Sequence, residues 1–108
     1  MRIDAGRAGI GERSDAWLTA VLRPAGNLDP PQVERLAGAL EALAASSDMV
    51  ILDLGAANVP EPYRLAAALR APARQLARPG RCLLLVSVPP EVLHALARTG
   101  VQAATLAA

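Results

Sequence analysis

The stretch that decides the fold is Met49-Val50-Ile51-Leu52-Asp53-Leu54, a continuous apolar run that contains a single acid. Its length suits a strand, and an apolar run without alternation is typical of a strand covered on both faces. We therefore expect residues 49–54 to form an inner strand of a sheet. Asp53 lies near the end of the run, where we expect its carboxylate to accept a hydrogen bond from the backbone.

Apolar patterns on both sides of this run predict alternating strands and helices. Further strands are expected over 17–23, where Pro24 ends the run, and over 81–87. Apolar residues three and four apart predict helices over 30–46, 62–78 and 90–99, each with proline at its start. Gly100, after the third helix, suits the left-handed position that ends a helix. We expect Pro72 to kink or break the second helix, because proline cannot donate a hydrogen bond to the carbonyl of Ala68. The remaining segment, 101–106, fits either a short strand or a helix.

The chain is long enough for one domain. It has 108 residues, of which 53% are hydrophobic and 19% charged, so it lacks the composition of a disordered protein. We expect a single domain over 1–108, with an irregular lead-in over 1–14 that has room for at most a short strand around residues 2–4. Because helices connect the strands, the predicted fold class is α/β, with a mixed, mostly parallel sheet of about four to five strands and helices packed against it.

Charge and hydropathy disfavour several kinds of partner. A net charge of +1 gives no electrostatic reason to expect binding to nucleic acid. No apolar run approaches the ~20 residues of a membrane helix, and the first residues lack the apolar segment of a signal peptide. The one cysteine, Cys82, allows no internal disulfide, which favours a reducing cytoplasm.

Side chains that carry out catalysis are scarce. His94 is the only histidine, so neither a histidine-based triad nor a two-histidine metal site can be built, and we expect it to be solvated. Cys82 lies among leucines, as a buried structural thiol does. The glycines between Gly6 and Gly11 match neither a dinucleotide fingerprint nor a phosphate loop. We therefore expect no catalytic residue, cofactor or metal, and a small enzyme or nucleotide binder is disfavoured.

Three segments together resemble a known family. The turn Ala25-Gly26-Asn27-Leu28-Asp29 precedes a leucine-rich helix, the apolar run 50–54 follows, and the segment 90–100 begins Pro-x-Val and ends Thr-Gly. In this order and spacing they resemble a STAS domain of the anti-sigma factor antagonist type, over about residues 15–106. The resemblance implies a STAS-type fold and a non-catalytic bacterial regulatory module that acts in transcription signalling by binding proteins.

The family's switch motif is altered in this chain. The family carries Asp-Ser-Ser-Gly at the start of the second helix, where a kinase phosphorylates usually the second serine. Counted forward from Leu54 without gaps, the motif falls on Glu61-Pro62-Tyr63-Arg64. The acid is kept as Glu61, both serines are absent, and Tyr63 stands at the phosphorylated position. The resemblance therefore implies protein binding without the serine phosphorylation switch, and we do not expect Tyr63 to be phosphorylated.

The docking surface expected from the resemblance combines the turn before the first helix, the altered switch segment and the arginine-bearing face of the second helix. Its residues are Asn27, Asp29, Glu61, Pro62, Tyr63, Arg64, Arg70 and Arg74. Tyrosine and arginine are favoured at protein interfaces. Half-buried packing for Tyr63 and a solvated arginine face remain the alternatives.

An anti-sigma factor or a serine-kinase-like protein is the partner that the resemblance implies. The alternative function is a STAS accessory subunit of a transporter or of a multi-subunit stress-signalling complex. The sequence leaves homodimerisation open.

Overall fold

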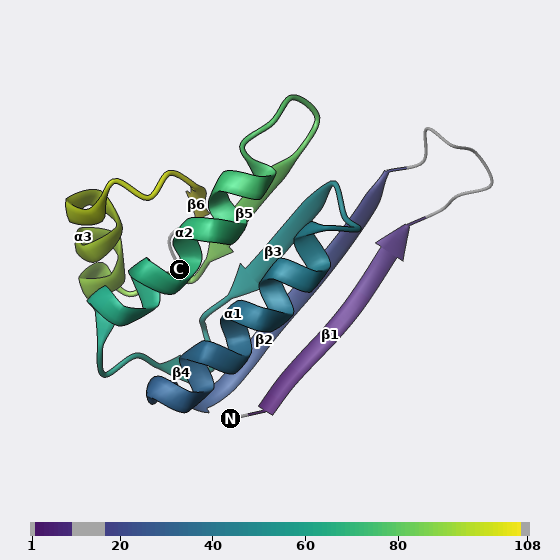
Figure 1. Cartoon of the computed structure of the whole chain (residues 1–108). Helices are drawn as coiled ribbons and strands as arrows, with labels where there is room; N and C mark the ends of the chain where they lie inside the picture. Colours follow the sequence, from purple (N-terminus) through teal and green to yellow (C-terminus); the bar gives the residue numbers. More distant parts are fainter. Residues whose placement is uncertain (1, 10–16, 107–108) are drawn as a thin grey trace.

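A mostly parallel sheet forms the centre of the fold. The computed structural model describes residues 2–9, by their backbone alone, and residues 17–106. The strand order is β1-β2-β3-β5-β6, with these strands formed by Arg2–Gly9, Leu18–Asn27, Met49–Asp53, Cys82–Val86 and Ala104–Leu106 (Figure 1). β1 is antiparallel to β2, and every later pair is parallel. A two-residue strand, β4 (Ala57–Asn58), pairs with the end of β2. The predicted α/β class with a mostly parallel sheet is confirmed.

Helices α1 (Pro30–Ala44), α2 (Pro62–Leu76) and α3 (Pro90–Thr99) connect the parallel strands. α1 lies over β2 and β3, α2 lies over β5, and α3 packs against α2 (Figure 1). The connected strands advance in one direction across the sheet, from β2 to β3, β5 and β6. Because such crossovers are right-handed, all three of these helices are placed on the same face of the sheet.

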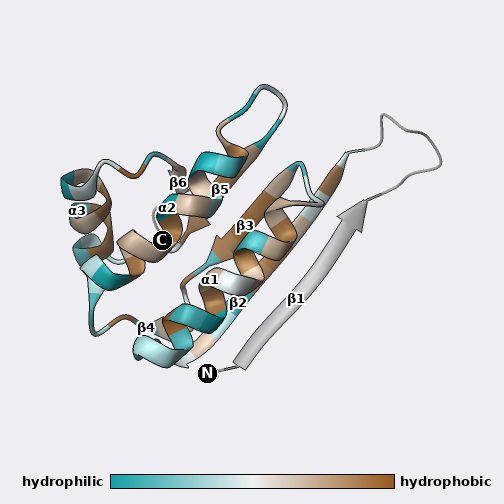
Figure 2. Cartoon of the chain, viewed as in Figure 1, coloured by the Kyte–Doolittle hydropathy of each residue, from teal (hydrophilic) through white to brown (hydrophobic). Residues whose placement is uncertain are grey.

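The core lies between that face and the helices. Leu22, Leu52 and Leu85 occupy aligned positions in neighbouring strands, and each is at most 1% exposed. A second buried row crosses the same strands: Ala20, Val50 and Leu83. The largest fully buried side chains of the described residues are leucines and valines, so packing depends on branched aliphatic groups. Figure 2 shows these strands in brown, with the hydrophilic residues of α1 and α2 in teal.

The opposite face of the sheet is only partly covered. Alternate residues of β3 and β5 on this face are half-buried: Met49, Ile51, Cys82, Leu84 and Val86. The expectation that residues 49–54 are covered on both faces is therefore wrong, because crossovers that advance in one direction leave the other face without a helix. Cys82 is accordingly half-buried at the first position of β5, and not a fully buried thiol.

β2 continues past Pro24 to Asn27, so the expectation that Pro24 ends this strand is wrong. Pro24 pairs with Ile3 of β1, and on its other side β2 changes partner from β3 to β4. The parallel ladder has no pairing at this position, so the missing N–H removes no bond from it. This agrees with the confinement of strand prolines to interrupted or edge positions.

β1 occupies a segment that was expected to be irregular apart from a short strand at residues 2–4. Each residue of Arg2–Gly9 pairs with one of residues 18–25 of β2. Its glycines and arginines give little strand signal, so pairing with an established neighbour determines its conformation and intrinsic propensity does not. The rest of the expected lead-in, residues 10–14, lies outside the described residues.

The helix ends agree with the sequence more closely than the strand ends. α1 ends at Ala44, two residues before the expected end, and α2 runs through Pro72 without a break. Pro72 lies on the buried face of α2, together with Leu69 and Ala73. Gly100 follows α3 with φ of 71°, the left-handed conformation expected for its position. Residues 104–106 form strand β6.

Candidate functional site

The turn after β2 and the loop after β3 form one hydrogen-bonded unit at the carboxyl ends of the parallel strands. The Asn58 side-chain amide donates to Asn27 Oδ1 at 3.1 Å. Backbone bonds run beside it, from Gly26 N to the Ala56 carbonyl (3.1 Å) and from Leu28 N to the Asn58 carbonyl (2.9 Å). Leu28 is fully buried and anchors the turn, while both asparagine side chains stay exposed. We call Asn27, Asp29, Asn58 and the segment 61–64 the strand-end cluster.

Asp29 stands at the N-cap of α1 and is exposed. Its carbonyl accepts the first helical bond, from Val33 N at 2.9 Å, but its carboxylate makes no capping hydrogen bond. Pro30 and Pro31 occupy the first two helical positions and have no N–H to offer to a cap. The carboxylate of Asp29 is therefore directed to solvent beside a helix N-terminus and is accessible to a partner.

The segment 61–64 forms the exposed start of α2. Glu61 is the N-cap residue, and its carbonyl accepts hydrogen bonds from Arg64 N and Leu65 N. Its carboxylate pairs with Arg64 instead of capping the helix, with 3.3 Å between Glu61 Oε1 and Arg64 Nε. Pro62 is half-buried at the first helical position. An exposed ion pair of this kind contributes little to stability, so both charges are available for an interface.

Tyr63 is 50% exposed and contacts the neighbouring helix. Its ring stands edge-on to that of His94, with centroids 6.4 Å apart and planes at 87°. This contact orients Tyr63 across the gap between the starts of α2 and α3. Half-buried packing, the alternative considered for Tyr63, is therefore partly correct: one side of the ring packs against His94, and the rest faces solvent.

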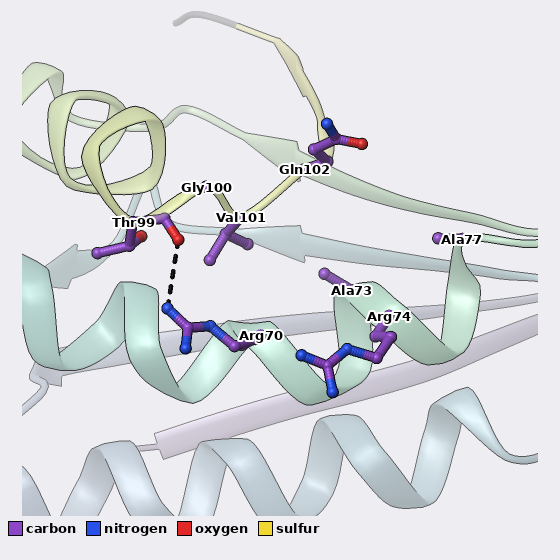
Figure 3. Close-up of a pocket in the computed structure, with 8 residues that line it drawn as sticks. All are labelled: Arg70, Ala73, Arg74, Ala77, Thr99, Gly100, Val101 and Gln102. Atoms are coloured by element: carbon purple, nitrogen blue, oxygen red, sulfur yellow. Dashed lines mark hydrogen bonds between the residues drawn. The ribbon is translucent and has the colours of Figure 1, made fainter.

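Arg70 and Arg74 line a cleft between α2 and the segment that follows α3. The cleft has a volume of about 390 Å³, and Figure 3 shows both arginines on α2 with Thr99, Gly100 and Val101 opposite. Arg70 donates to the carbonyl oxygen of Thr99 at 3.2 Å. We call this hollow the α2–α3 cleft; it is lined by Arg70, Ala73, Arg74, Ala77, Thr99, Gly100, Val101 and Gln102.

The structure thus divides the predicted contact residues into two groups. Asn27, Asp29 and the segment 61–64 belong to the strand-end cluster, whereas Arg70 and Arg74 belong to the α2–α3 cleft. Tyr63 and Arg74 share one side of α2 and are separated along it by about 16 Å, at 1.5 Å per residue over eleven residues. The groups therefore lie along one helix, as an extended surface.

Three contributors to this surface were not predictable from the sequence. Asn58 lies in a two-residue strand, which is too short to predict from a pattern. His94 and Thr99 enter only because α3 packs against α2, and a single sequence carries no signal for that juxtaposition. His94 is exposed, as expected, but it also holds the ring of Tyr63.

The remaining polar groups have structural roles. Asp53 Oδ1 accepts a hydrogen bond from Gly55 N at 2.9 Å, as expected for a strand-end acid, and its other oxygen lies 3.7 Å from Arg23 Nε. Among the described side chains, no group of three or more His, Cys, Asp or Glu is close enough together to hold a metal ion. Within the described part of the chain, no helix has the length and hydropathy needed to cross a membrane.

Solved structures identify the fold. No family model matches the sequence, and no curated protein matches it. The arrangement is the STAS fold, that of the anti-sigma factor antagonists. One solved structure with this fold is that of the anti-sigma factor antagonist SpoIIAA in its unphosphorylated form, which aligns with 95% of this chain and 89% of its own length, with a TM-score of 0.66 and 13% identity. The Bacillus cell fate determinant SpoIIAA in its phosphorylated form aligns with 95% of this chain and 91% of its own, with a TM-score of 0.62 and 14% identity.

Proposed function

We propose that this protein is a non-catalytic regulatory module that binds an anti-sigma factor, or a related serine-kinase-like regulator, without being switched by serine phosphorylation. The STAS fold supports the first part of the proposal, because SpoIIAA, an anti-sigma factor antagonist, has the same fold. The scarcity of reactive side chains supports a role in binding. The partner, the absence of phosphorylation and a place in the cytoplasm are parts of this proposal.

The observation that carries the proposal is the exposed start of α2. Glu61, Tyr63 and Arg64, which belong to the strand-end cluster, are all exposed there. The sequence contains no serine or threonine from residue 48 to residue 86, a stretch that includes the whole of α2. A serine kinase that recognises this region therefore finds no hydroxyl of the right kind.

With Tyr63 at this position, a charge switch is replaced by a permanent contact to the partner. A phosphoserine at a helix start adds up to about two negative charges beside exposed backbone N–H groups. A tyrosine ring at that position instead offers a large, rigid apolar surface and a polar hydroxyl. Binding through Tyr63 would thus be constitutive and regulated by the supply of either protein.

The docking test is size-exclusion chromatography of the protein with candidate anti-sigma factors. Co-elution with one of them is the expected result, and co-elution with a transporter or stress-complex subunit would favour the accessory-subunit alternative. Circular dichroism on the same sample checks folding. A folded protein that co-elutes with no candidate contradicts the docking proposal.

The phosphorylation test uses the same kinase partner with ATP, followed by mass spectrometry. The wild-type peptide that contains 61–64 is expected to stay unmodified. A triple variant, Pro62→Ser with Tyr63→Ser and Arg64→Gly, restores the hydroxyls and glycine of the family motif and is expected to gain phosphate. Phosphate on wild-type Tyr63, or on a serine such as Ser87, contradicts the proposed loss of the switch.

A further inference from the structure

Residues 62–90, in the second half of the chain, contain arginines but no acid. There are five of these arginines: Arg64, Arg70, Arg74, Arg78 and Arg81. The net charge of the chain is only +1, so the acids that balance these arginines lie elsewhere in the sequence. The stretch from α2 to the strand after it is therefore basic in sequence, although the protein as a whole is nearly neutral.

Three of these arginines already have partners within the described residues. Arg64 pairs with Glu61, Arg70 donates to the Thr99 carbonyl, and Arg81 donates to the Ala44 carbonyl at 3.5 Å. The side chain of Arg74, which lines the α2–α3 cleft, has neither a hydrogen bond nor an ion pair among the described residues. Its guanidinium is therefore available to a ligand.

The hydrogen bond from Arg70 to the Thr99 carbonyl connects the two sides of the cleft. Arg70 is tied to the end of α3, so its guanidinium stays at the mouth of the cleft while Arg74 lies one turn further along α2 (Figure 3). No acidic side chain lines the cleft. Arginine presents several N–H groups in one plane and binds a carboxylate through two parallel hydrogen bonds, so this pair is suited to a carboxylate.

A second hollow of about 310 Å³ continues the cleft toward β5. The two hollows share the walls Ala73, Ala77 and Gln102. The second adds mainly apolar surface, from Leu76, Cys82, Leu83, Ala103 and Ala104, with Arg81 as its charged member. Recognition along this groove thus changes from charged to apolar over a short distance.

The form of the groove favours a segment of chain over a small free anion. Both hollows are open to solvent, and they follow α2 and the stretch 99–104 side by side. A small anion is held best where it is enclosed, whereas an extended segment can place neighbouring side chains into successive hollows. Charge complementarity requires that segment to be acidic.

We propose that the α2–α3 cleft seats an acidic segment of a partner protein, with a carboxylate held between Arg70 and Arg74 and a neighbouring apolar side chain in the second hollow. This inference rests on the proposed function, since it names the chemistry of the partner at the same surface. It adds that recognition extends from Tyr63 to Gln102 and is weakened by salt, because the contacts that select the partner are exposed charges.

A nuclear magnetic resonance titration tests the cleft without a known partner. The labelled full-length chain is titrated with a hexapeptide, blocked at both ends, in which glutamate alternates with leucine. We expect the Nε–H signal of Arg74 and the amide signals of Gly100, Val101 and Gln102 to shift together. A matched peptide with glutamine in place of glutamate is expected to bind at least fivefold more weakly, the upper range for exposed charge pairs.

Charge reversal supplies the decisive comparison. Arg74→Glu is expected to reduce peptide affinity at least fivefold, whereas Arg35→Glu, an equal charge change on the exposed side of α1, is expected to leave it within about twofold. A lysine–leucine peptide is expected to bind Arg74→Glu more tightly than the wild type. Equal effects of the two reversals, or peptide shifts away from the cleft, would overturn the inference.

The two proposals fail separately. If the chromatographic partner binds wild type and Arg74→Glu equally well, the cleft is not its recognition site, although the proposed function stands. If the peptide occupies the cleft while no regulatory partner binds, the recognition chemistry is supported and the proposed function fails.

Discussion

The ring of Tyr63 stands edge-on to the ring of His94, with 6.4 Å between their centroids. This contact links the first turn of α2 to α3 and fixes the direction in which Tyr63 faces solvent. Edge-to-face pairs contribute about 0.5–1.5 kcal/mol beyond their buried area, so this orientation of the Tyr63 ring is favoured over others. A partner thus meets a preoriented aromatic group, which lowers the entropy cost of binding.

Replacement of Tyr63 tests its role in docking. Tyr63→Ala is expected to weaken partner binding by about 1–2 kcal/mol, roughly five- to thirtyfold, because an interface tyrosine contributes a large contact area. Tyr63→Phe keeps the ring and is expected to lose less. Isothermal titration calorimetry gives both values. Trp17→Ala is the matched control, since Trp17 is also exposed, at 49%, and directly precedes β2, at the end of that strand away from Asn27. An equal loss in this variant would show that Tyr63 has no special role.

Asp48 holds the beginnings of β2 and β3 together. Its carboxylate Oδ2 accepts from Leu18 N at 2.8 Å, and its own N donates to the Leu18 carbonyl at 2.8 Å. Asp48→Ala is expected to lower the free energy of unfolding by about 1.5–3 kcal/mol, as for other hydrogen bonds to charged groups, and Asp48→Asn by less. Urea denaturation measures the change. Asp29→Ala removes an acid that makes no capping bond and is expected to cost less than about 0.5 kcal/mol.

The two faces of β3 differ in what a truncation costs. Leu52 is fully buried beneath the helices, so Leu52→Ala is expected to destabilise the protein by about 2–5 kcal/mol. Ile51 lies next to it on the half-buried face, and Ile51→Ala is expected to cost about 1 kcal/mol. Chemical denaturation measures both losses, and the m-value is expected to stay unchanged. Equal losses would mean that the open face is packed as tightly as the core.

Replacement by alanine is expected to have opposite effects on stability at two glycines that differ in backbone conformation. Gly38 lies within α1 with free space around its Cα, so Gly38→Ala is expected to stabilise the protein by about 0.4–1 kcal/mol. Gly100 has equal space but a φ of 71°, and Gly100→Ala is expected to cost about 1–2 kcal/mol because of the left-handed conformation. Thermal unfolding of both variants compares them directly, and a shift of the same sign in both would contradict this explanation.

The sequence predicted elements whose signals are local. Strand β3, the proline at the start of each helix and the left-handed Gly100 each depend on neighbouring residues, and the structure has them where they were expected. The one-sided cover of β3 was not predictable from its apolar run, because it depends on the direction in which successive crossovers advance. β1 was missed for a similar reason, since its partner in β2 and not its own residues determines its conformation.

The candidate site also combines features that neighbouring residues predict with features that depend on the packing of distant elements. The exposed start of α2 could be located from the spacing between Leu54 and Glu61, a count along the chain. The contacts that shape the surface could not, because Asn27 with Asn58 and Arg70 with Thr99 lie 31 and 29 residues apart. Packing of whole elements brings these pairs together, and one sequence does not reveal it.

Strand order across the sheet follows chain order, apart from the short β4, and this bears on how the polypeptide assembles during synthesis. Each new strand joins at the outer edge beside the one made before it, so none has to be inserted between two strands already paired. Because synthesis delivers the N-terminal part first, Leu22 and Leu52 can pack before β5 and β6 have left the ribosome. Each addition closes only one crossover, the longest being residues 54–81, and the entropy cost of such a closure grows slowly with its length. The fold is therefore suited to vectorial assembly, with β6 completing it last.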